Sequence, residues 1–484
     1  MEFDTDLVGT NQLDLKYDSD ATKLVNQLSS KNISPDDWGY PGYLTLSQEE
    51  AVRNLEKELR RRDHNLRSAV FSYPGVNEDL SSALCRWLRS NQFDVCKTIK
   101  KIEESYKYSY VARQNGFYED QDEALGVERS IYLQQFPQLY HGKSKAGAPV
   151  MISQLGKLNN KGAECVTTVE RVLNFHWSEM THTFGNQLKR YASDGGKPTR
   201  CELVLILDLD GLTSSQLTKK IMYLIKTQCF IDELCFPESL NRMICINSPA
   251  FFTFIWKIIK GWIDPRNGGK VELYGTNKHD WLNRLHQLID KCELPSDYGG
   301  TCKSVNELLK ERMMDDYKKK NRSHPGIVRQ NTTVLSVNDR ASHCIVAKQN
   351  RIIRLALWTN SKASARIVIK DKNGTLDCMP ANGIHLKCIQ HNKKDEHIPR
   401  QYNLDEYNVF LQGPGVFTID IMTDGQKKAS FLLVETEHEN SGDLTERVDE
   451  GLRTNFRRSM SLGHGTYRDI YEDRDDNIDF VQRG

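Results

Sequence analysis

The sequence predicts a multidomain protein in which a helical amino-terminal region and an α/β domain are followed by an all-β sandwich. Three observations support this fold class. The chain has 484 residues, which is more than a single hydrophobic core usually organises. From Phe136 onward, apolar strand-like runs alternate with helical patterns, as in a sheet covered by helices. Beyond the charge run Lys318–Lys320, short alternating strands are separated by turn residues, which is typical of a β-sandwich.

Composition and local pattern divide the chain into six expected segments. Polar residues dominate the first stretch and charged residues the last, and both lack the apolar content of a packed core. The expected boundaries are 1–44 for a loosely ordered arm, 45–125 for the helical region, 126–312 for the α/β domain, 313–330 for a linker, 331–435 for the sandwich and 436–484 for a disordered charged tail.

The helical region is expected to contain two blocks. Ser47–Glu50 reads as a capping box for a helix from Glu49 to Arg62. The second block runs from Glu78 to about Lys107 and is divided near Asn91–Gln92. Its apolar positions, which we expect to share one core, are Leu84, Trp87, Leu88, Phe93 and Val95.

The two later domains are predicted element by element. The α/β domain is expected to contain strand Pro149–Ile152, helix Ala163–Tyr191, strand Leu203–Leu209, helix Ser215–Cys229 and strand Met243–Asn247. The sandwich is expected to contain the strands Cys344–Ala347, Ile352–Trp358, Ala365–Lys370, Ile384–Cys388, Asn408–Leu411, Val416–Met422 and Ser430–Glu435.

Charge and cysteine usage exclude several classes of function. Lysine and arginine total 66 against 65 aspartates and glutamates, so no overall field favours nucleic acid as a partner. The twelve cysteines are scattered, without a CxxC pair or a Cys/His cluster at zinc spacing, and no metal site is expected. The acidic amino terminus does not read as a signal peptide, so we expect a reducing, cytoplasmic location.

A strongly apolar helix is expected from Phe251 to Ile263. Its polar residues recur at spacings that place them on one narrow stripe, while the apolar arc is wider than one core contact requires. It is too short and too charged to span a bilayer. Two interpretations remain open: a helix buried on all sides, or a helix between a cavity and a second apolar neighbour. The side chains assigned to this surface are Phe251, Phe252, Phe254, Trp256, Lys257 and Lys260.

The stretch INSPAFFTFIWKIIKGWIDPRNGGKVELYG resembles the gate region of the CRAL-TRIO family, which includes phosphatidylinositol transfer proteins. The sequences RWLRSNQFDV and LPSDYGG extend the resemblance. It implies a lipid cavity lidded by a mobile helix that contacts membranes when open. The order and number of the later strands, with GPGVF followed by FLLVE, are similar to the GOLD domain that follows CRAL-TRIO in some proteins.

The resemblance also implies headgroup-binding residues. A glutamate before the central strand and a lysine opening the strand after the gate correspond to Glu238 and Lys270, and Tyr140 matches a family tyrosine. A basic pair of some members is replaced by Asn91–Gln92. The polar positions that hold phosphatidylcholine are replaced by Met151, Leu203 and Leu205, which suit an acyl chain or another apolar ligand but offer no strong hydrogen bond.

An alternative function rests on Leu205–Thr213. An apolar strand that ends in Asp208-Leu-Asp210-Gly resembles the first motif of haloacid-dehalogenase phosphatases, in which the first aspartate is the nucleophile and the second the acid/base. Such an enzyme also needs a lysine and a paired acidic Mg²⁺ site at strand ends. The CRAL-TRIO family has an aspartate at this place in the fold, which favours a structural role.

The sequence therefore predicts a cytoplasmic, peripherally membrane-associated lipid-binding and transfer protein without catalytic residues or a cofactor other than its bound lipid. The expected partners are a phospholipid similar to phosphatidylinositol, or another hydrophobic ligand, a transient membrane surface and a protein that binds the sandwich. A tocopherol-, retinoid- or sterol-like ligand, carried or sensed by a scaffold, remains the second interpretation.

Overall fold

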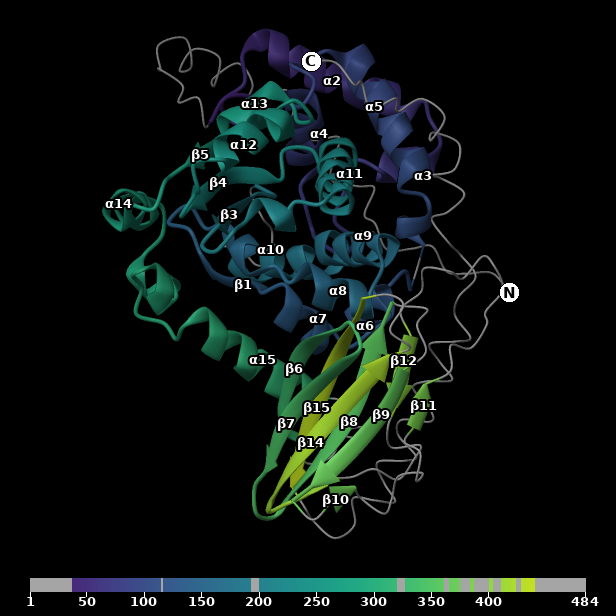
Figure 1. Cartoon of the computed structure of the whole chain (residues 1–484). Helices are drawn as coiled ribbons and strands as arrows, with labels where there is room; N and C mark the ends of the chain where they lie inside the picture. The colour runs from purple at the N-terminus through teal and green to yellow at the C-terminus, as the bar shows by residue number, and fades with distance from the viewer. Residues whose placement is uncertain are drawn as a thin grey trace, which may run out of the picture.

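The computed structural model describes residues 37–114, 116–192, 200–319, 327–360, 365–372, 374–375, 384–386, 400–403, 411–423 and 428–439. Two bodies are visible in Figure 1: an upper body of helices around a twisted sheet, and an elongated β-sandwich below it. This arrangement confirms the expected multidomain fold class, with helical, α/β and all-β parts in chain order.

Short helices form the amino-terminal region, with bounds α2 Leu46–Arg60, α3 His64–Ser68, α4 Leu80–Arg89, α5 Val95–Tyr108, α6 Gln121–Leu125 and α7 Arg129–Gln135. The N-cap of α2 is Thr45, whose side chain and that of Gln48 form a capping box, so the helix begins earlier than the Ser47 cap that we expected. Leu84, Trp87 and Leu88 lie in one buried cluster against α2, with Phe93 and Val95 packed on it, as the periodicity predicted.

The α/β domain is built on a five-stranded sheet of order β1-β2-β3-β4-β5, with bounds Gln138–Lys143, Pro149–Ser153, Leu203–Asp208, Leu240–Ile246 and Val271–Leu273. The β1 and β2 strands are antiparallel, and the remaining neighbours are parallel. The accompanying helices are α8 Asn160–Val166, α9 Val169–Ser178, α10 Gly185–Tyr191, α11 Lys219–Cys235, α12 Phe252–Lys260, α13 Pro265–Gly269, α14 Lys278–Leu288 and α15 Val305–Lys319.

The sandwich consists of two antiparallel sheets. Its strands are β6 Ile327–Val337, β7 Arg340–Ala347, β8 Arg351–Thr359, β9 Ala365–Asp371, β10 Gly374–Thr375, β11 Ile384–Leu386, β12 Arg400–Asn403, β13 Leu411–Gln412, β14 Gly415–Thr423 and β15 Ala429–Glu439. One sheet has the order β10-β9-β14-β7, with β11 on β9, and the other has the order β12-β8-β15-β6, with β13 on β8. Alternate residues of both sheets, such as Ile345, Leu357, Ile419 and Phe431, fill the core between them.

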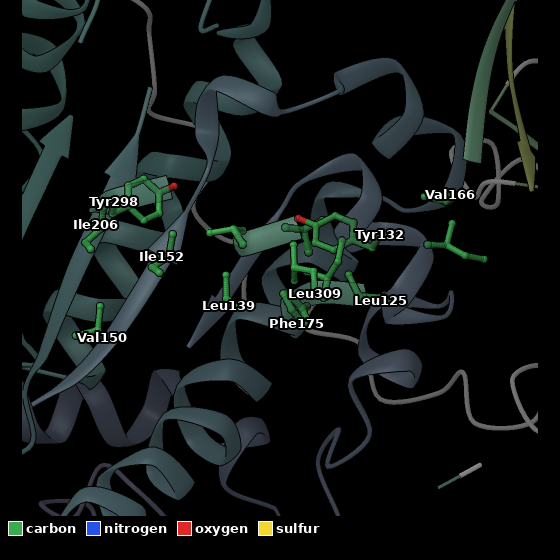
Figure 2. Packing of buried hydrophobic residues seen from close by; sticks show 14 of the residues in the cluster. Leu125, Tyr132, Leu139, Val150, Ile152, Val166, Phe175, Ile206, Tyr298 and Leu309 are labelled. Carbon is green, nitrogen blue, oxygen red and sulfur yellow. The ribbon is translucent and has the colours of Figure 1, made fainter. Parts of the chain in front are cut away.

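The two bodies share a hydrophobic core. The cluster that joins the α/β sheet to its helices, part of which Figure 2 shows around Tyr132, Phe175 and Val166, also contains Trp358, Leu432 and Val434 of the sandwich. Polar contacts border this interface. Gln135 Nε2 donates to Thr332 Oγ1 at 2.8 Å, and Cys165 Sγ donates to the Ser430 carbonyl at 3.4 Å. The β6-β15-β8 sheet therefore docks on α7 and α8.

Several expected boundaries need correction. The helix expected over Ala163–Tyr191 is interrupted: α9 begins at a new cap, Thr168, and a π-helical segment, Glu179–Phe184, precedes α10. After Asp264 the chain forms the short helix α13, which the sequence analysis does not predict, because Pro265 fits the first turn of a helix and Asp264 caps it.

Within the expected linker 313–330, α15 runs through the first part to Lys319, and β6 begins at Ile327. The sequence analysis missed β6, β10 and β12. The sandwich ends later than expected, at Glu439, so the tail prediction applies only to residues that the structure does not describe, as does most of the arm prediction for 1–44. The expected strand positions 387–388 and 408–410 also lie outside the described residues.

Within the described part, no helix combines the length and apolar character of a membrane span.

Candidate functional site

Glu238 lies at the centre of a buried ionic cluster. It occupies the connection between α11 and β4, is 3% exposed and adopts a left-handed backbone conformation with φ 58°. A glutamate in this conformation is uncommon, which indicates that its surroundings hold it in place. The connection turns the carboxylate toward three cationic side chains, one from the amino-terminal helices and two from the stretch that follows α12.

These cations are Arg89 at the end of α4, Arg266 in α13 and Lys270 directly before β5. Their nitrogens lie 3.0, 3.0 and 3.3 Å from the Glu238 oxygens, with Arg266 on Oε1 and the other two on Oε2. Burial favours a higher pKa for Glu238, but the charges of Lys270, Arg266 and Arg89 outweigh it and hold the pKa below its ordinary value. Glu238 is thus an ionised carboxylate in a protein-made cage of positive charge.

Lys270 is fixed by more than Glu238. Its Nζ donates to the Leu240 carbonyl at 2.8 Å, which ties β5 to the start of β4. Glu202, directly before β3, also faces this lysine. Burial raises the pKa of Glu202 to about 7, although the charge of Lys270 and a hydrogen bond from Asn241 oppose the shift. The structure therefore brings together the sequence-predicted Glu238 and Lys270, while their role in binding stays a prediction.

The predicted cavity residues form a row on one face of the sheet. Tyr140 pairs with Met151, Met151 with Leu205, and Leu205 with Met243, so these side chains stand beside one another across four strands. Leu203, two residues before Leu205, shares this face. Tyr140 and Leu203 are buried in the same cluster, against which Met151 and Leu205 pack. Burial raises the pKa of the Tyr140 phenol well above its ordinary value.

The apolar helix α12 packs over the neighbouring part of this face. Phe252 is 2% exposed and lies in a cluster with Cys245, against which Phe251, Trp256 and Met243 also pack. Phe254, in contrast, is 67% exposed, and Lys257 and Lys260 are exposed as well. In Figure 1, α12 and α13 lie at the end of the molecule opposite the sandwich. The helix thus has one face on the sheet, while the apolar residues Phe254 and Ile258 face outward.

Asp208 is held by structural hydrogen bonds. Its Oδ1 accepts from Asn247 Nδ2 at 2.8 Å and from the Asp210 backbone N–H at 3.0 Å, and its Oδ2 accepts from Tyr298 Oη at 3.0 Å. Asp208 is 7% exposed. The described residues contain no group of three His, Cys, Asp or Glu side chains arranged to hold a metal ion. This geometry favours the structural interpretation of the Asp-Leu-Asp-Gly motif, because both oxygens of the supposed nucleophile are occupied.

A comparison with protein families identifies the domain to which this sheet and its helices belong. Residues 133–300 match the family model for the CRAL/TRIO domain, a range that contains Tyr140, Glu238, α12 and Lys270. This stretch is a CRAL/TRIO domain.

Curated relatives match about half of this chain. The phosphatidylinositol/phosphatidylcholine transfer protein SFH9 of Arabidopsis thaliana is 31% identical over 261 residues, which is 53% of this chain and 43% of that protein. The SEC14 cytosolic factor of Yarrowia lipolytica is 28% identical over 55% of this chain and 50% of that protein. The chain thus spans about half the length of these relatives. The crystal structure of Sfh5 aligns with 62% of this chain and 100% of that chain at 14% identity, with a TM-score of 0.38.

The sequence reading of this CRAL/TRIO domain missed Arg89 and Arg266 as partners of Glu238. The RWLR motif could have indicated a role for Arg89. Arg86 and Arg89 are three residues apart in it and therefore share one face of the helix. Both are buried, and Arg86 pairs with Glu78 at 2.9 Å. Arg266 follows Asp264-Pro265, where α13 was not expected, so its direction was not predictable from the pattern.

Proposed function

We propose that this protein binds a phospholipid with an inositol-type headgroup and exchanges it at membranes. The observation that carries the proposal is the contact of 3.3 Å between Lys270 and the buried Glu238, in a chain whose relatives are named phosphatidylinositol/phosphatidylcholine transfer proteins. A phosphate pairs with the cations, and inositol hydroxyls donate to the carboxylate. Buried charges need such partners, and a headgroup supplies both kinds.

The acyl chains would lie against the apolar row of Tyr140, Met151, Leu205 and Met243, under α12. Each buried methylene contributes about 0.8 kcal/mol, so two acyl chains supply enough free energy to compete with a bilayer. Lipid entry requires α12 to move away from this face. Phe254 is already exposed and is the side chain that would first enter the membrane interface, with Lys257 and Lys260 near anionic headgroups.

The protein would act in the cytoplasm and touch membranes only during exchange. No residue is proposed to carry out covalent chemistry. The sandwich, which docks on α7 and α8 at the end of the molecule opposite α12, leaves its outer sheet β9-β14-β7 as the surface for a protein partner.

A second candidate function is supported by one specific observation. Leu203, Leu205 and Met151 share one face of the sheet and offer a headgroup no strong hydrogen bond. A tocopherol-, retinoid- or sterol-like ligand has one polar group and a large apolar body, and it would fill this region without the partners that a choline phosphate needs.

The test is mass spectrometry of organic extracts from protein purified after exposure to a cell lysate, combined with transfer between vesicles. We expect near-stoichiometric phosphatidylinositol in the wild type and its loss in Lys270→Ala. Lys310→Ala, an exposed lysine of α15, is the matched control and should retain the lipid. Recovery of an isoprenoid or a sterol would favour the second candidate function over phosphatidylinositol binding. Recovery of protein without any lipid would overturn both candidate functions.

A further inference from the structure

The segment Asp37–Tyr40, expected to belong to a loosely ordered arm, docks on the cluster around Glu238. Asp37 pairs with Arg200 at 2.5 Å, and the Trp38 carbonyl accepts a hydrogen bond from Arg89 Nη1. The Trp38 ring meets Phe93 edge to face, with 5.4 Å between ring centroids. The same arginine that reaches Glu238 is therefore held from its other side by this segment.

Tyr40 stands between two guanidinium groups. The Arg89 group lies 3.8 Å and the Arg200 group 3.9 Å from its ring centroid, and Tyr40 is only 7% exposed. Cations favour the face of an aromatic ring. Two arginines repel each other at this separation, and a tyrosine between them keeps both charges in one place. The arrangement concentrates positive charge next to Glu238 rather than dispersing it into solvent.

Gly39 shows that this docking is closely fitted. Its φ is +75°, and a Cβ at this position would lie 2.8 Å from Phe93 Cε2 and 3.0 Å from Arg89 Cγ. A side chain at this position would both strain the backbone and push Arg89 from its place. The close contact between this segment and α4 therefore requires glycine at position 39.

The Tyr40 hydroxyl indicates that a ligand binds here. It is buried, and among the described residues it has no hydrogen-bond partner. An unpaired buried hydroxyl costs about 1 to 3 kcal/mol, and native structures rarely leave one without a reason. A hydroxyl beside two guanidinium groups is a donor set that a phosphate oxygen would satisfy.

We propose that Tyr40, Arg89 and Arg200 form a subsite for a phosphate ester beside Glu238 and Lys270. This inference rests on the proposed function, because it assigns the phosphate of the bound headgroup to Arg200 within the CRAL/TRIO domain and to Tyr40 and Arg89, which precede it. The Tyr40 hydroxyl donates to a phosphate oxygen, and Arg200, whose guanidinium has five N–H donors, contacts the phosphate while it keeps Asp37. The phosphate belongs either to a lipid or to a free phosphate in solution.

The test uses the full chain and three single variants. Tyr40→Phe removes only the hydroxyl and keeps the ring between the arginines, Arg200→Gln removes one cation, and Tyr43→Phe alters a neighbouring exposed tyrosine as the control. Uptake of phosphatidylinositol from vesicles is measured for each. We expect a loss of about threefold to tenfold in Tyr40→Phe, about tenfold or more in Arg200→Gln, and no change in Tyr43→Phe. Melting temperatures close to that of the wild type would show that the variants fold.

The outcomes separate this subsite from the proposed function. If Tyr40→Phe and Arg200→Gln take up lipid like the wild type while Lys270→Ala does not, the subsite is wrong and the proposed function stands. If the wild type takes up no phosphatidylinositol, the melting temperature is measured in inorganic phosphate against sodium chloride at equal ionic strength. A rise in the wild type but not in Tyr40→Phe would assign the subsite to free phosphate, and no rise would overturn it.

Discussion

Arg266 and Glu238 form an ion pair with a nitrogen–oxygen distance of 3.0 Å, and this contact ties α13, which follows α12, to the start of β4. Asp264, the cap of α13, is the other carboxylate near Arg266, at 3.4 Å. If α12 moves to admit a lipid, α13 follows it in the chain, and the Arg266 contact is the first to be strained. The carboxylate proposed to receive the headgroup is thus also an anchor of the helix proposed to release it.

Glu238→Gln should destabilise the protein strongly. It leaves Arg89, Arg266 and Lys270 without their shared buried carboxylate, and removal of one member of a buried ion pair costs about 3 to 5 kcal/mol. Arg266→Gln removes a side chain that is 28% exposed and leaves the other two cations paired, so we expect about 1 kcal/mol. Urea unfolding measures both. Equal losses in the two variants would contradict the central position of Glu238.

Glu202→Gln should change the pH dependence of stability. Burial raises the pKa of Glu202 to about 7 from an ordinary value of 4.5, so between these values the folded protein keeps a proton that the unfolded chain releases. This group therefore lowers the stability of the wild type as pH rises from about 4.5 to about 7. Relative to the wild type, the free energy of unfolding of Glu202→Gln should increase by about 2 to 3 kcal/mol between pH 5 and pH 8. A difference independent of pH would exclude the raised pKa.

Phe254→Asp should impair lipid exchange without affecting stability. The side chain is 67% exposed, so it contributes little to the core, and its proposed role begins only at a membrane. Transfer between vesicles should fall about tenfold or more while the melting temperature stays unchanged. Val346→Asp, an exposed apolar residue of the sandwich at 60%, is the control and should transfer normally. Normal transfer by Phe254→Asp would remove the membrane contact from α12.

Gly162→Ala should weaken the contact between the two bodies. A Cβ at Gly162 would lie 2.0 Å from Gln135 Oε1 and 3.0 Å from Val334 Cγ2, and Gln135 also donates to Thr332 across the interface. We expect a loss of about 1 to 3 kcal/mol in the free energy of unfolding. Gly269→Ala in α13 is the control, because a Cβ there meets no atom within 4 Å. Similar losses in both variants would contradict an interface effect.

Periodicity predicted much of the fold because its elements are strongly patterned. The buried strand Leu203–Asp208 and the split between α4 and α5 follow directly from apolar runs and turn residues. The mixed polar composition of β6 hides its alternation, and its residues are mostly half-buried, since one face meets the α/β domain. The π-helical segment carries no local signal at all, because its conformation depends on tertiary packing.

The candidate site was only partly predictable. Glu238 and Lys270 came from the resemblance to a family, and the structure brings the two side chains together, but their partners Arg89 and Arg266 lie on helices whose orientation depends on the whole fold. The sequence places Tyr40 in an arm whose polar composition predicts little order. Its docking depends on charge and ring contacts with Arg89 and Arg200 rather than on apolar periodicity.

The shared core between the sandwich and the α/β domain limits how this chain can be rearranged. Because Trp358, Leu432 and Val434 belong to the same cluster as Val166 and Tyr132, the sandwich is not an exchangeable module joined by a tether. A graft of this sandwich onto another protein would carry an apolar face without its cover, and a CRAL/TRIO fragment cut at α15 would expose the opposite face. Genetic exchange of either part would require simultaneous adaptation of α7 and α8.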